Sequence, residues 1–406
     1  MTASDSNVVR VTTLRTERLP NEIWIEVETA DGRVGLGETY GNSATVEAYV
    51  HEAVAPYLLG QDADPVERHW WAMYRNWGPG GIGVESRTLS ATDMALWDLL
   101  GKKTSLPLHA LLGGAVRPRI RAYNTCGGPE YGAPPLVPGA DMRGLPHSGD
   151  DAPHPHEDLR AFHEEPERLA AELIEMGFHA MKIWPLDPIA NATDGHAPSD
   201  EQIRRGLEPL RRIRAAHGDA IEIALEMHGR WDLPAAIRIA KAAEQYRPLW
   251  FEDPIPTEDM TALARFVAAT SIPTLCGENL GPFQPYGPLI ESGVGIVSAD
   301  PSYCGGLTGL KRVADLAGLR HRSLIAHDCQ GPVNLAISVH LACHADAAAL
   351  QEMVRAFYFG WYGDYVTGQP AFEHGWLRPV DAPGHGVGLR PDIRPTLRMT
   401  ESRLDA

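Results

Sequence analysis

Cysteine is scarce in this sequence, and its few copies form no metal-binding or disulfide pattern. The count is five in 406 residues, which is odd, and no C-x-x-C pair occurs; the positions are Cys126, Cys276, Cys304, Cys329 and Cys343. This spacing argues against a small disulfide framework and against a cysteine-based zinc site. We expect a protein whose thiols stay reduced.

Lys and Arg residues are fewer than Asp and Glu residues, and the apolar runs are short. Lys and Arg total 36 against 53 Asp and Glu, which gives a formal net charge of −17. Such a surface repels phosphate backbones, so we expect no nucleic-acid partner, although a local cation can still admit an anionic small molecule to one pocket. No apolar run reaches the length of a membrane span, and residues 1–9 lack the apolar core of a signal peptide. We therefore expect a cytoplasmic protein without a membrane partner.

The spacing of apolar residues along the sequence changes near residue 119. Residues 8–40 alternate as two or three antiparallel strands, and residues 43–114 carry helical periodicity. After residue 119, short apolar runs alternate with amphipathic stretches. The expected strands are Ile120–Asn124, His179–Trp184, Ile221–Met227, Leu249–Asp253, Thr274–Glu278, Ile296–Asp300, Leu324–His327 and Leu350–Met353. Eight such units predict an α/β fold with a closed (β/α)₈ barrel rather than an open doubly wound sheet.

These patterns divide the chain into three parts. We expect an α+β capping domain at 1–118, the barrel at 119–355, and a C-terminal segment at 356–406 that returns to the cap and completes it. Residues 127–160 interrupt the first barrel unit with an aperiodic stretch rich in Pro, Gly, Asp and His. Because it follows a barrel strand, this stretch belongs at the face where barrel active sites form, and we interpret it as a lid. A solvated insertion without function is the alternative.

Glutamates stand at the ends of three consecutive expected strands. Glu226, Glu252 and Glu278 follow one another at intervals of 26 residues, which is one strand–helix unit each. The three carboxylates should therefore converge at one face of the barrel, where their mutual repulsion requires a cation. An all-oxygen donor set favours Mg²⁺ over Zn²⁺. Separately capped strand ends are the alternative, and three in register make it the weaker one.

The later strands end in a second group of polar residues. Asp300 and His327 are 27 residues apart at the ends of neighbouring strands, so the carboxylate can fix the imidazole tautomer and raise its basicity. A His held in this way beside a metal site is expected to act as a general base. Glu352 ends the last strand, where it either contacts substrate or serves as a structural carboxylate.

The second and third strands supply further candidates. Lys182 and Trp184 point to the same side of one strand, so both can face the site. His228 follows Glu226 by two residues and suits a general acid; the alternative is a His that only orients a metal-binding carboxylate.

These residues, in this order, resemble the mandelate racemase subgroup of the enolase superfamily over nearly the whole chain. The resemblance extends beyond the barrel carboxylates, Asp300 and His327. It includes Gly35–Glu38 and Ala91–Asp98, the Leu-Leu-Gly-Gly segment at 111–114, and Cys304–Gly306. The resemblance implies a shared first step, in which a base removes the proton α to a carboxylate and Mg²⁺ stabilises the enediolate.

Departures from the family pattern narrow the expected reaction. Trp184 stands where racemising members carry a second Lys, so two-base racemisation is not expected. His228, in a Glu-x-His-Gly-Arg context, resembles the general acid of sugar acid dehydratases of the D-galactonate dehydratase type. Lys182 matches a Lys that helps to neutralise the substrate carboxylate in relatives. Glu226 stands where Asp is the commoner first ligand, which lengthens this arm by one methylene group.

The resemblance therefore implies a Mg²⁺-dependent acid-sugar dehydratase acting on an aldonate or aldarate. His327, held by Asp300, would remove the proton at carbon 2, and His228 would protonate the hydroxyl that leaves carbon 3. Trp184, Tyr40 and Asn42 would shape specificity, and a homo-oligomer is expected. An epimerase or cycloisomerase that uses the same enolate is one alternative; a sugar-acid-binding protein without turnover is another.

Overall fold

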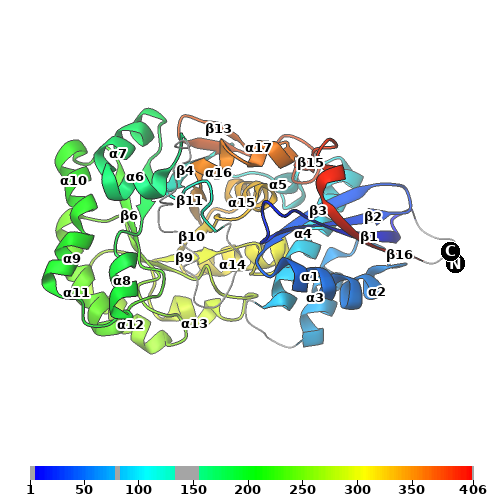
Figure 1. Cartoon of the computed structure of the whole chain (residues 1–406). Helices are drawn as coiled ribbons and strands as arrows, with labels where there is room; N and C mark the ends of the chain where they lie inside the picture. Colours follow the sequence, from blue (N-terminus) through cyan, green and yellow to red (C-terminus); the bar gives the residue numbers. More distant parts are fainter. Residues whose placement is uncertain (1–4, 78–82, 133–154, 405–406) are drawn as a thin grey trace.

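The computed structural model describes residues 5–77, 83–132 and 155–404. A strand-rich cap, blue in Figure 1, lies beside a larger helix-ringed barrel that runs from cyan through green and yellow to orange. Within the described ranges, no helix combines the length and the apolar character needed to cross a lipid bilayer.

The cap is built on a four-stranded antiparallel sheet with the order β16-β1-β2-β3. Its strands are β1 (Val8–Arg15), β2 (Glu22–Thr29), β3 (Val34–Tyr40) and β16 (Arg398–Arg403). In β2, Ile23 and Ile25 are buried against the cap helices, whereas Trp24 joins the core of the barrel. Both faces of this sheet are therefore covered, one by the cap's own helices and the other by the barrel.

The cap helices follow the sheet in sequence and cover its outer face. They are α1 (Ser43–Tyr49), α2 (Ala55–Leu58), α3 (Val66–Trp77) and α4 (Val84–Thr104), with a π-helical turn at Val50–Val54. The short helix α5 (Leu108–Leu111) follows them and packs against α4 and the barrel helix Pro332–His344. Two glycines bring β3 and α4 into direct backbone contact. A Cβ atom at Gly35 would lie 2.0 Å from the Ala95 carbonyl oxygen, and one at Gly37 would lie 1.8 Å from that of Ala91. Any side chain at either position would force the helix off the sheet.

Eight parallel strands close into a barrel, which confirms the predicted fold. They are β4 (Ile120–Thr125), β5 (Ala180–Ile183), β6 (Glu222–Glu226), β7 (Phe251–Glu252), β8 (Thr274–Cys276), β9 (Ile296–Ala299), β10 (Ser323–Ala326) and β11 (Ala348–Met353). Closure comes from the pairing of β11 with β4. Five of the strands, β5 to β9, are shorter than predicted, and at β7 and β8 the positive φ angles of Asp253 and Gly277, 35° and 123°, end the ladders.

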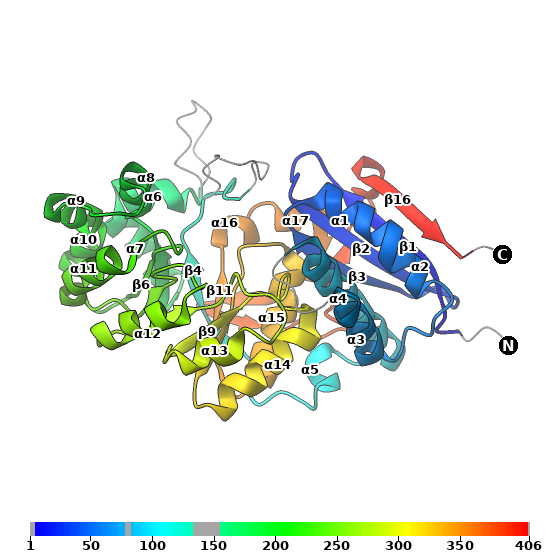
Figure 2. The same ribbon diagram turned by 90° about the horizontal axis from the view of Figure 1, so that it is seen from below.

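Helices surround the barrel and alternate with its strands. They are α6 (Asp158–Glu164), α7 (Pro166–Glu175), α8 (Asp187–Thr193), α9 (Asp200–Gly206), α10 (Glu208–His217), α11 (Leu233–Ala243), α12 (Met260–Ala269), α13 (Tyr286–Glu291), α14 (Gly306–Leu319) and α15 (Pro332–His344), with 3₁₀ turns at Glu244–Tyr246 and, in the C-terminal segment, Arg394–Thr396. Viewed from below in Figure 2, these helices enclose the strands, and the cap lies at one side.

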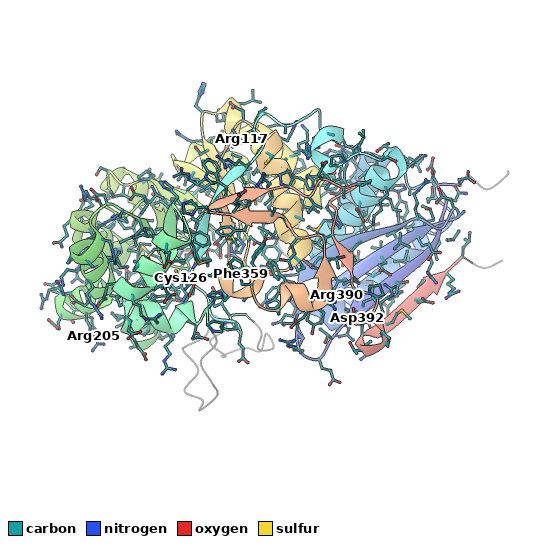
Figure 3. The ribbon with its side chains drawn as sticks, turned by 90° about the horizontal axis from the view of Figure 1, so that it is seen from above. Arg117, Cys126, Arg205, Phe359, Arg390 and Asp392 are labelled. Atoms are coloured by element: carbon teal, nitrogen blue, oxygen red, sulfur yellow. The ribbon has the colours of Figure 1, made fainter. Side chains whose placement is uncertain are left out.

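The C-terminal segment runs from the barrel back to the cap. Its elements are α16 (Arg355–Tyr358), α17 (Tyr362–Tyr365), β12 (Val366–Thr367), β13 (Ala371–Glu373), β14 (Trp376–Arg378) and β15 (Gly388–Leu389), followed by β16. The β13–β14 hairpin pairs with β4, and β16 pairs with β1 in the cap sheet. In Figure 3, Arg390 and Asp392 of this segment lie beside the cap, whereas Arg205 marks the far end of the barrel.

Residues 133–154 of the expected lid lie outside the described residues. The flanking part at Tyr131 and Gly132 reaches the cap, because the Asn21 side chain donates a 2.8 Å hydrogen bond to the Gly132 carbonyl oxygen. The lid function of 127–160 stays a prediction.

Asp98 ties three parts of the chain together at the cap–barrel junction. Its fully buried carboxylate accepts hydrogen bonds from the Leu36 N–H at 2.9 Å, the Lys102 ammonium at 2.6 Å and the His385 N–H at 3.3 Å. We expect Asp98→Ala to lower the free energy of unfolding by about 3 kcal/mol, because the Lys102 ammonium and two backbone N–H groups lose a fully buried acceptor. The midpoint of urea unfolding measures this loss.

The exposed pair of Lys311 and Asp315 is a matched control. It has the same i,i+4 spacing and the same 2.6 Å contact, but water surrounds it. Asp315→Ala should change the free energy of unfolding by less than about 0.5 kcal/mol. Equal losses in the two variants would contradict the importance of burial at Asp98.

Candidate active site

Three glutamates meet where neighbouring barrel strands end. Glu226 is the last residue of β6 and pairs in register with Glu252, the last residue of β7; Glu278 follows β8 by two residues. All three side chains are buried, and one carboxylate oxygen from each lies within 4.8 Å of the other two. The structure thus brings together the three residues that the 26-residue spacing indicated.

Lys182 extends from β5 into the middle of this group. Its Nζ lies 2.6 Å from Glu252 Oε1, 2.8 Å from Glu352 Oε1 and 3.2 Å from Glu226 Oε2. Burial lowers the pKa of Lys182, but the surrounding carboxylates raise it well above its ordinary value. One fixed ammonium therefore neutralises only part of the charge of four carboxylates.

The carboxylate cluster has the donors and the spacing that a hard divalent cation needs. Glu226 Oε1 accepts hydrogen bonds from the backbone N–H groups of Met227 and His228, at 3.0 and 2.7 Å. Glu226 Oε2 and Glu278 Oε2 are buried without a hydrogen-bond partner among the described residues. Oxygen ligands of one octahedral Mg²⁺ lie roughly 3 to 4 Å apart, and the three glutamates each offer an oxygen within 4.8 Å of the other two. The residues present fit such an ion.

Charge in the cluster shifts the pKa values of its members in opposite directions. Burial raises the pKa of Glu252 well above its ordinary range, with Glu226 and Glu352 adding to the rise against the effect of Lys182. Burial acts in the same sense on Glu226, but His228 and Lys182 outweigh it and lower that pKa to about 2. Glu252 therefore binds a proton more tightly than Glu226 does, as is usual when acidic groups lie close together.

Asp300 and His327 form a hydrogen-bonded pair at the ends of β9 and β10. Asp300 Oδ2 lies 2.7 Å from His327 Nδ1, which leaves Nε2 as the free nitrogen, 3.6 Å from Glu278 Oε2. Burial lowers the pKa of His327, but Glu278 and Glu352 raise it more strongly, to well above its ordinary value. Nε2 is thus directed at the carboxylate cluster, as a general base acting there requires.

A second His–Asp pair lies across the barrel mouth. His228 Nδ1 is 2.8 Å from Asp187 Oδ2, and the His228 ring meets the edge of Trp184 at 5.6 Å between centroids. His228 has a positive φ of 53°, which turns the chain just after Glu226. Since β6 and β10 are four strands apart in a ring of eight, His228 and His327 face the cluster from opposite sides.

The remaining predicted residues have different surroundings. Glu352 is buried and accepts hydrogen bonds from Lys182, the Thr125 hydroxyl and the Asp328 N–H. The Tyr40 hydroxyl donates to the Gly132 carbonyl oxygen and lines a pocket between cap and barrel. Asn42 is exposed at the start of α1 and is not among the residues that line this pocket.

Three residues at the site were not predicted from the sequence. Asp187 lies 41 residues before its partner His228, in the first turn of α8. Gln330 donates hydrogen bonds to both Asp300 and the Tyr303 hydroxyl. Glu22 lines the pocket between cap and barrel. The position of Asp187 shortly after the second barrel strand was the one feature of the sequence that could have indicated a place at the site.

Comparisons with known proteins match both parts of the chain. The model of the mandelate racemase / muconate lactonizing enzyme N-terminal domain covers residues 4–113, and that of the enolase C-terminal domain-like family covers residues 165–393. A D-galactonate dehydratase of Ralstonia nicotianae is 32% identical over 404 residues, 97% of this chain and 95% of the relative. One from Pectobacterium atrosepticum is 30% identical over 394 residues, 95% and 93% of the two chains.

Solved structures agree with this assignment. An enolase of the mandelate racemase subgroup from Agrobacterium tumefaciens superimposes with a TM-score of 0.85 at 35% identity, covering 98% of this chain and 99% of its own. An enolase protein from environmental sequencing of the Sargasso Sea gives a TM-score of 0.86 at 35% identity, covering 98% and 100%. The chain therefore belongs to the mandelate racemase subgroup of the enolase superfamily, and it is an enzyme of the hydro-lyase class.

Proposed function

We propose that this enzyme is an acid-sugar dehydratase, which converts an aldonate or aldarate into a 2-keto-3-deoxy acid. The observation that carries the proposal is the pair of His–Asp dyads on opposite sides of one carboxylate cluster. Elimination of water needs a base for the proton at carbon 2 and an acid for the hydroxyl at carbon 3. The names of the curated relatives support the same reaction.

The proposed roles of the two histidines follow from which ring nitrogen of each is not bonded to an Asp. His327 Nε2 takes the proton at carbon 2, while Asp300 holds Nδ1 and favours the resulting imidazolium. Lys182 supplies positive charge beside the substrate carboxylate. His228, held through Nδ1 by Asp187, donates a proton from Nε2 to the hydroxyl that leaves carbon 3 as water. The enol product then tautomerises to the keto acid.

We propose that Glu226, Glu252 and Glu278 hold Mg²⁺. The ion, when bound, supplies a Lewis acid that stabilises negative charge developing on the substrate carboxylate. Of these three carboxylates, Glu278 raises the pKa of His327, together with Glu352, and a base must be neutral to accept a proton.

Two further expectations belong with this proposal. All five cysteines are free, which agrees with the proposed cytoplasmic location in a reducing environment. A homo-oligomer is proposed on the strength of the family resemblance. The substrate itself is a small molecule.

Metal binding should be visible without any turnover. We expect Mg²⁺ to raise the thermal unfolding midpoint, by the equivalent of about 2.7 kcal/mol at a hundredfold excess over its Kd, because it relieves repulsion in the folded state alone. Glu226→Gln should remove this shift, since it deletes one ligand. In the control, Glu291→Gln alters an exposed carboxylate and should leave the shift intact. A shift that survives Glu226→Gln would place the ion elsewhere.

When the reaction is run in D₂O, substitution of each histidine should block a different step. His327→Asn should abolish both product formation and deuterium incorporation at carbon 2, with a rate loss of at least about 10³-fold. His228→Asn should block product formation but still exchange the carbon-2 proton, because the base remains. Mass spectrometry and ¹H NMR of the recovered substrate distinguish these outcomes.

A matched control is offered by His196, whose Nδ1 is also 2.8 Å from an Asp, Asp232, but which is 67% exposed. His196→Asn should keep full activity. Recovered substrate with deuterium and inverted configuration would favour the epimerase instead. Binding of sugar acids without conversion of any would favour the non-catalytic alternative.

A further inference from the structure

A second group of metal-binding side chains lies beside the carboxylate cluster. Ligand atoms of His327, Cys329 and Glu352 all lie within 4.8 Å of one another. Unlike the three glutamates, this group combines an imidazole, a thiol and a carboxylate. Among the described residues, no other cysteine belongs to such a group. The proposed dehydration gives His327 a role, but it assigns none to the Cys329 thiol.

The order of the barrel strands explains why these three side chains meet. His327 directly follows β10, and Cys329 comes two residues later, a spacing that favours the same side of the chain as a strand ends. Glu352 is the penultimate residue of β11, the strand that pairs with β10. Neighbouring strand ends therefore supply all three side chains at the barrel mouth.

The Cys329 thiol is directed at Glu352. It donates a hydrogen bond to Glu352 Oε1, with 3.9 Å between sulfur and oxygen. In a tetrahedral zinc site, with Zn–S of roughly 2.3 Å and Zn–O of roughly 2.0 Å, two such ligand atoms lie roughly 3.5 Å apart. A cation that takes the place of the thiol proton therefore requires only a small movement of these side chains. The proton leaves to solvent, and the thiolate and the carboxylate become ligands.

His327 is oriented to supply the third ligand. Asp300 Oδ2 lies 2.7 Å from Nδ1, so Nε2 is the nitrogen that a metal ion can reach. A carboxylate behind a metal-binding imidazole is the usual arrangement in zinc sites, where it fixes the ring and makes the nitrogen a better ligand. With water as a fourth ligand, the three side chains complete a tetrahedron.

The ligand types decide which cations suit this group. Thiolate and imidazole bind Zn²⁺ and other soft divalent cations, whereas Mg²⁺ prefers oxygen ligands alone. Burial, followed by the charge of Glu352, raises the pKa of the Cys329 thiol to about 12. The thiol is therefore neutral until a cation displaces its proton, as zinc does in thiolate sites.

The surrounding charges favour a cation on balance. Lys182 Nζ lies 2.8 Å from Glu352 Oε1 and opposes cation binding there. Two carboxylates act in the other direction, because Asp300 and Glu278 lie 2.7 and 3.6 Å from the two ring nitrogens of His327. With Glu352 itself, three carboxylates face one ammonium group around this group of ligands.

Cys329 also gives the group a route of entry. His327 and Glu352 are buried, whereas Cys329 is half-buried and lines the pocket between cap and barrel. An ion that enters from this pocket meets the sulfur atom first. A metal site needs such a path as well as suitable ligands.

We propose that His327 Nε2, Cys329 Sγ and a Glu352 oxygen form a second metal site, which binds a soft divalent cation such as Zn²⁺ or Cd²⁺, and that its occupation inhibits the enzyme. The binding is independent of the proposed function. The inhibition rests on that function, because a cation on Nε2 occupies the lone pair that would accept the carbon-2 proton. Mg²⁺ at the three glutamates should not protect the enzyme, since the two sites share no ligand.

Titration of the full chain with Cd²⁺ at saturating Mg²⁺ tests the binding without any turnover. A bond between Cd²⁺ and a thiolate produces a charge-transfer band in the ultraviolet. We expect this band to saturate at about one equivalent of Cd²⁺ and to disappear when Zn²⁺ competes for the site. Cys329→Ser should abolish the band. Wild-type protein without a band, or an unchanged band in Cys329→Ser, would overturn the proposal.

Cys343→Ala is the matched control. Its thiol is also buried, and burial raises its pKa to about 11, but the charged group that acts on it is Arg117 rather than a carboxylate. This variant should keep the whole band. Loss of the band in Cys343→Ala would overturn the assignment to Cys329.

His327→Asn tests the imidazole ligand separately from the thiolate. The variant should bind Cd²⁺ at least about tenfold more weakly, and the band should persist at higher Cd²⁺ because Cys329 remains. Unchanged affinity in a folded His327→Asn variant would contradict the three-ligand site.

Inhibition distinguishes the failure of the site from the failure of the proposed function. Zn²⁺ should inhibit the wild type at saturating Mg²⁺, and Cys329→Ser should require at least about tenfold more Zn²⁺ for the same fractional loss of its own rate. Relief of wild-type inhibition by added Mg²⁺ would instead place Zn²⁺ at the three glutamates and overturn inhibition through His327. Wild-type protein that shows the Cd²⁺ band but forms no 2-keto-3-deoxy acid would contradict the dehydratase and leave the metal site standing.

Discussion

Repulsion between buried carboxylates governs the chemistry at the barrel mouth. Glu226 and Glu252 end adjacent strands whose backbone hydrogen bonds hold them together, and Glu278 follows the next strand by two residues. Lys182 offsets part of their charge, yet two carboxylate oxygens stay without a hydrogen-bond partner among the described residues. Folding therefore prepares a site with an excess of negative charge, which a dication can neutralise and which a neutral molecule cannot.

The two histidines depend on this same cluster. His327 receives its orientation from Asp300 and its altered pKa from nearby carboxylates, while the His228 backbone N–H holds Glu226 in place. The proposed base and the proposed acid are thus coupled to one charged centre from two sides. The cap adds Tyr40 and Glu22 to the walls of the pocket beside this centre.

The sequence predicted the parts of the site that follow the barrel period. Glu252 and His327 each come one strand–helix unit after a partner, so spacing alone placed them together. Asp187 and Glu22 could not be placed in this way, because the first belongs to a helix turn after β5 and the second reaches the site only when the cap docks. Positive φ angles at Asp253 and Gly277 shortened two predicted strands, since local hydrophobicity carries no information on where a ladder ends. The pairing of β16 with β1 joins the two ends of the chain and shows no local pattern.

Anomalous diffraction from crystals grown with Mn²⁺, which accepts the same oxygen ligands as Mg²⁺, tests the central claim most directly. The account predicts one strong peak at about 2.2 Å from an oxygen of each of Glu226, Glu252 and Glu278, with Lys182 still beside Glu352. Carboxylates that stay paired with Lys182, with no peak between them at saturating Mn²⁺, would contradict it.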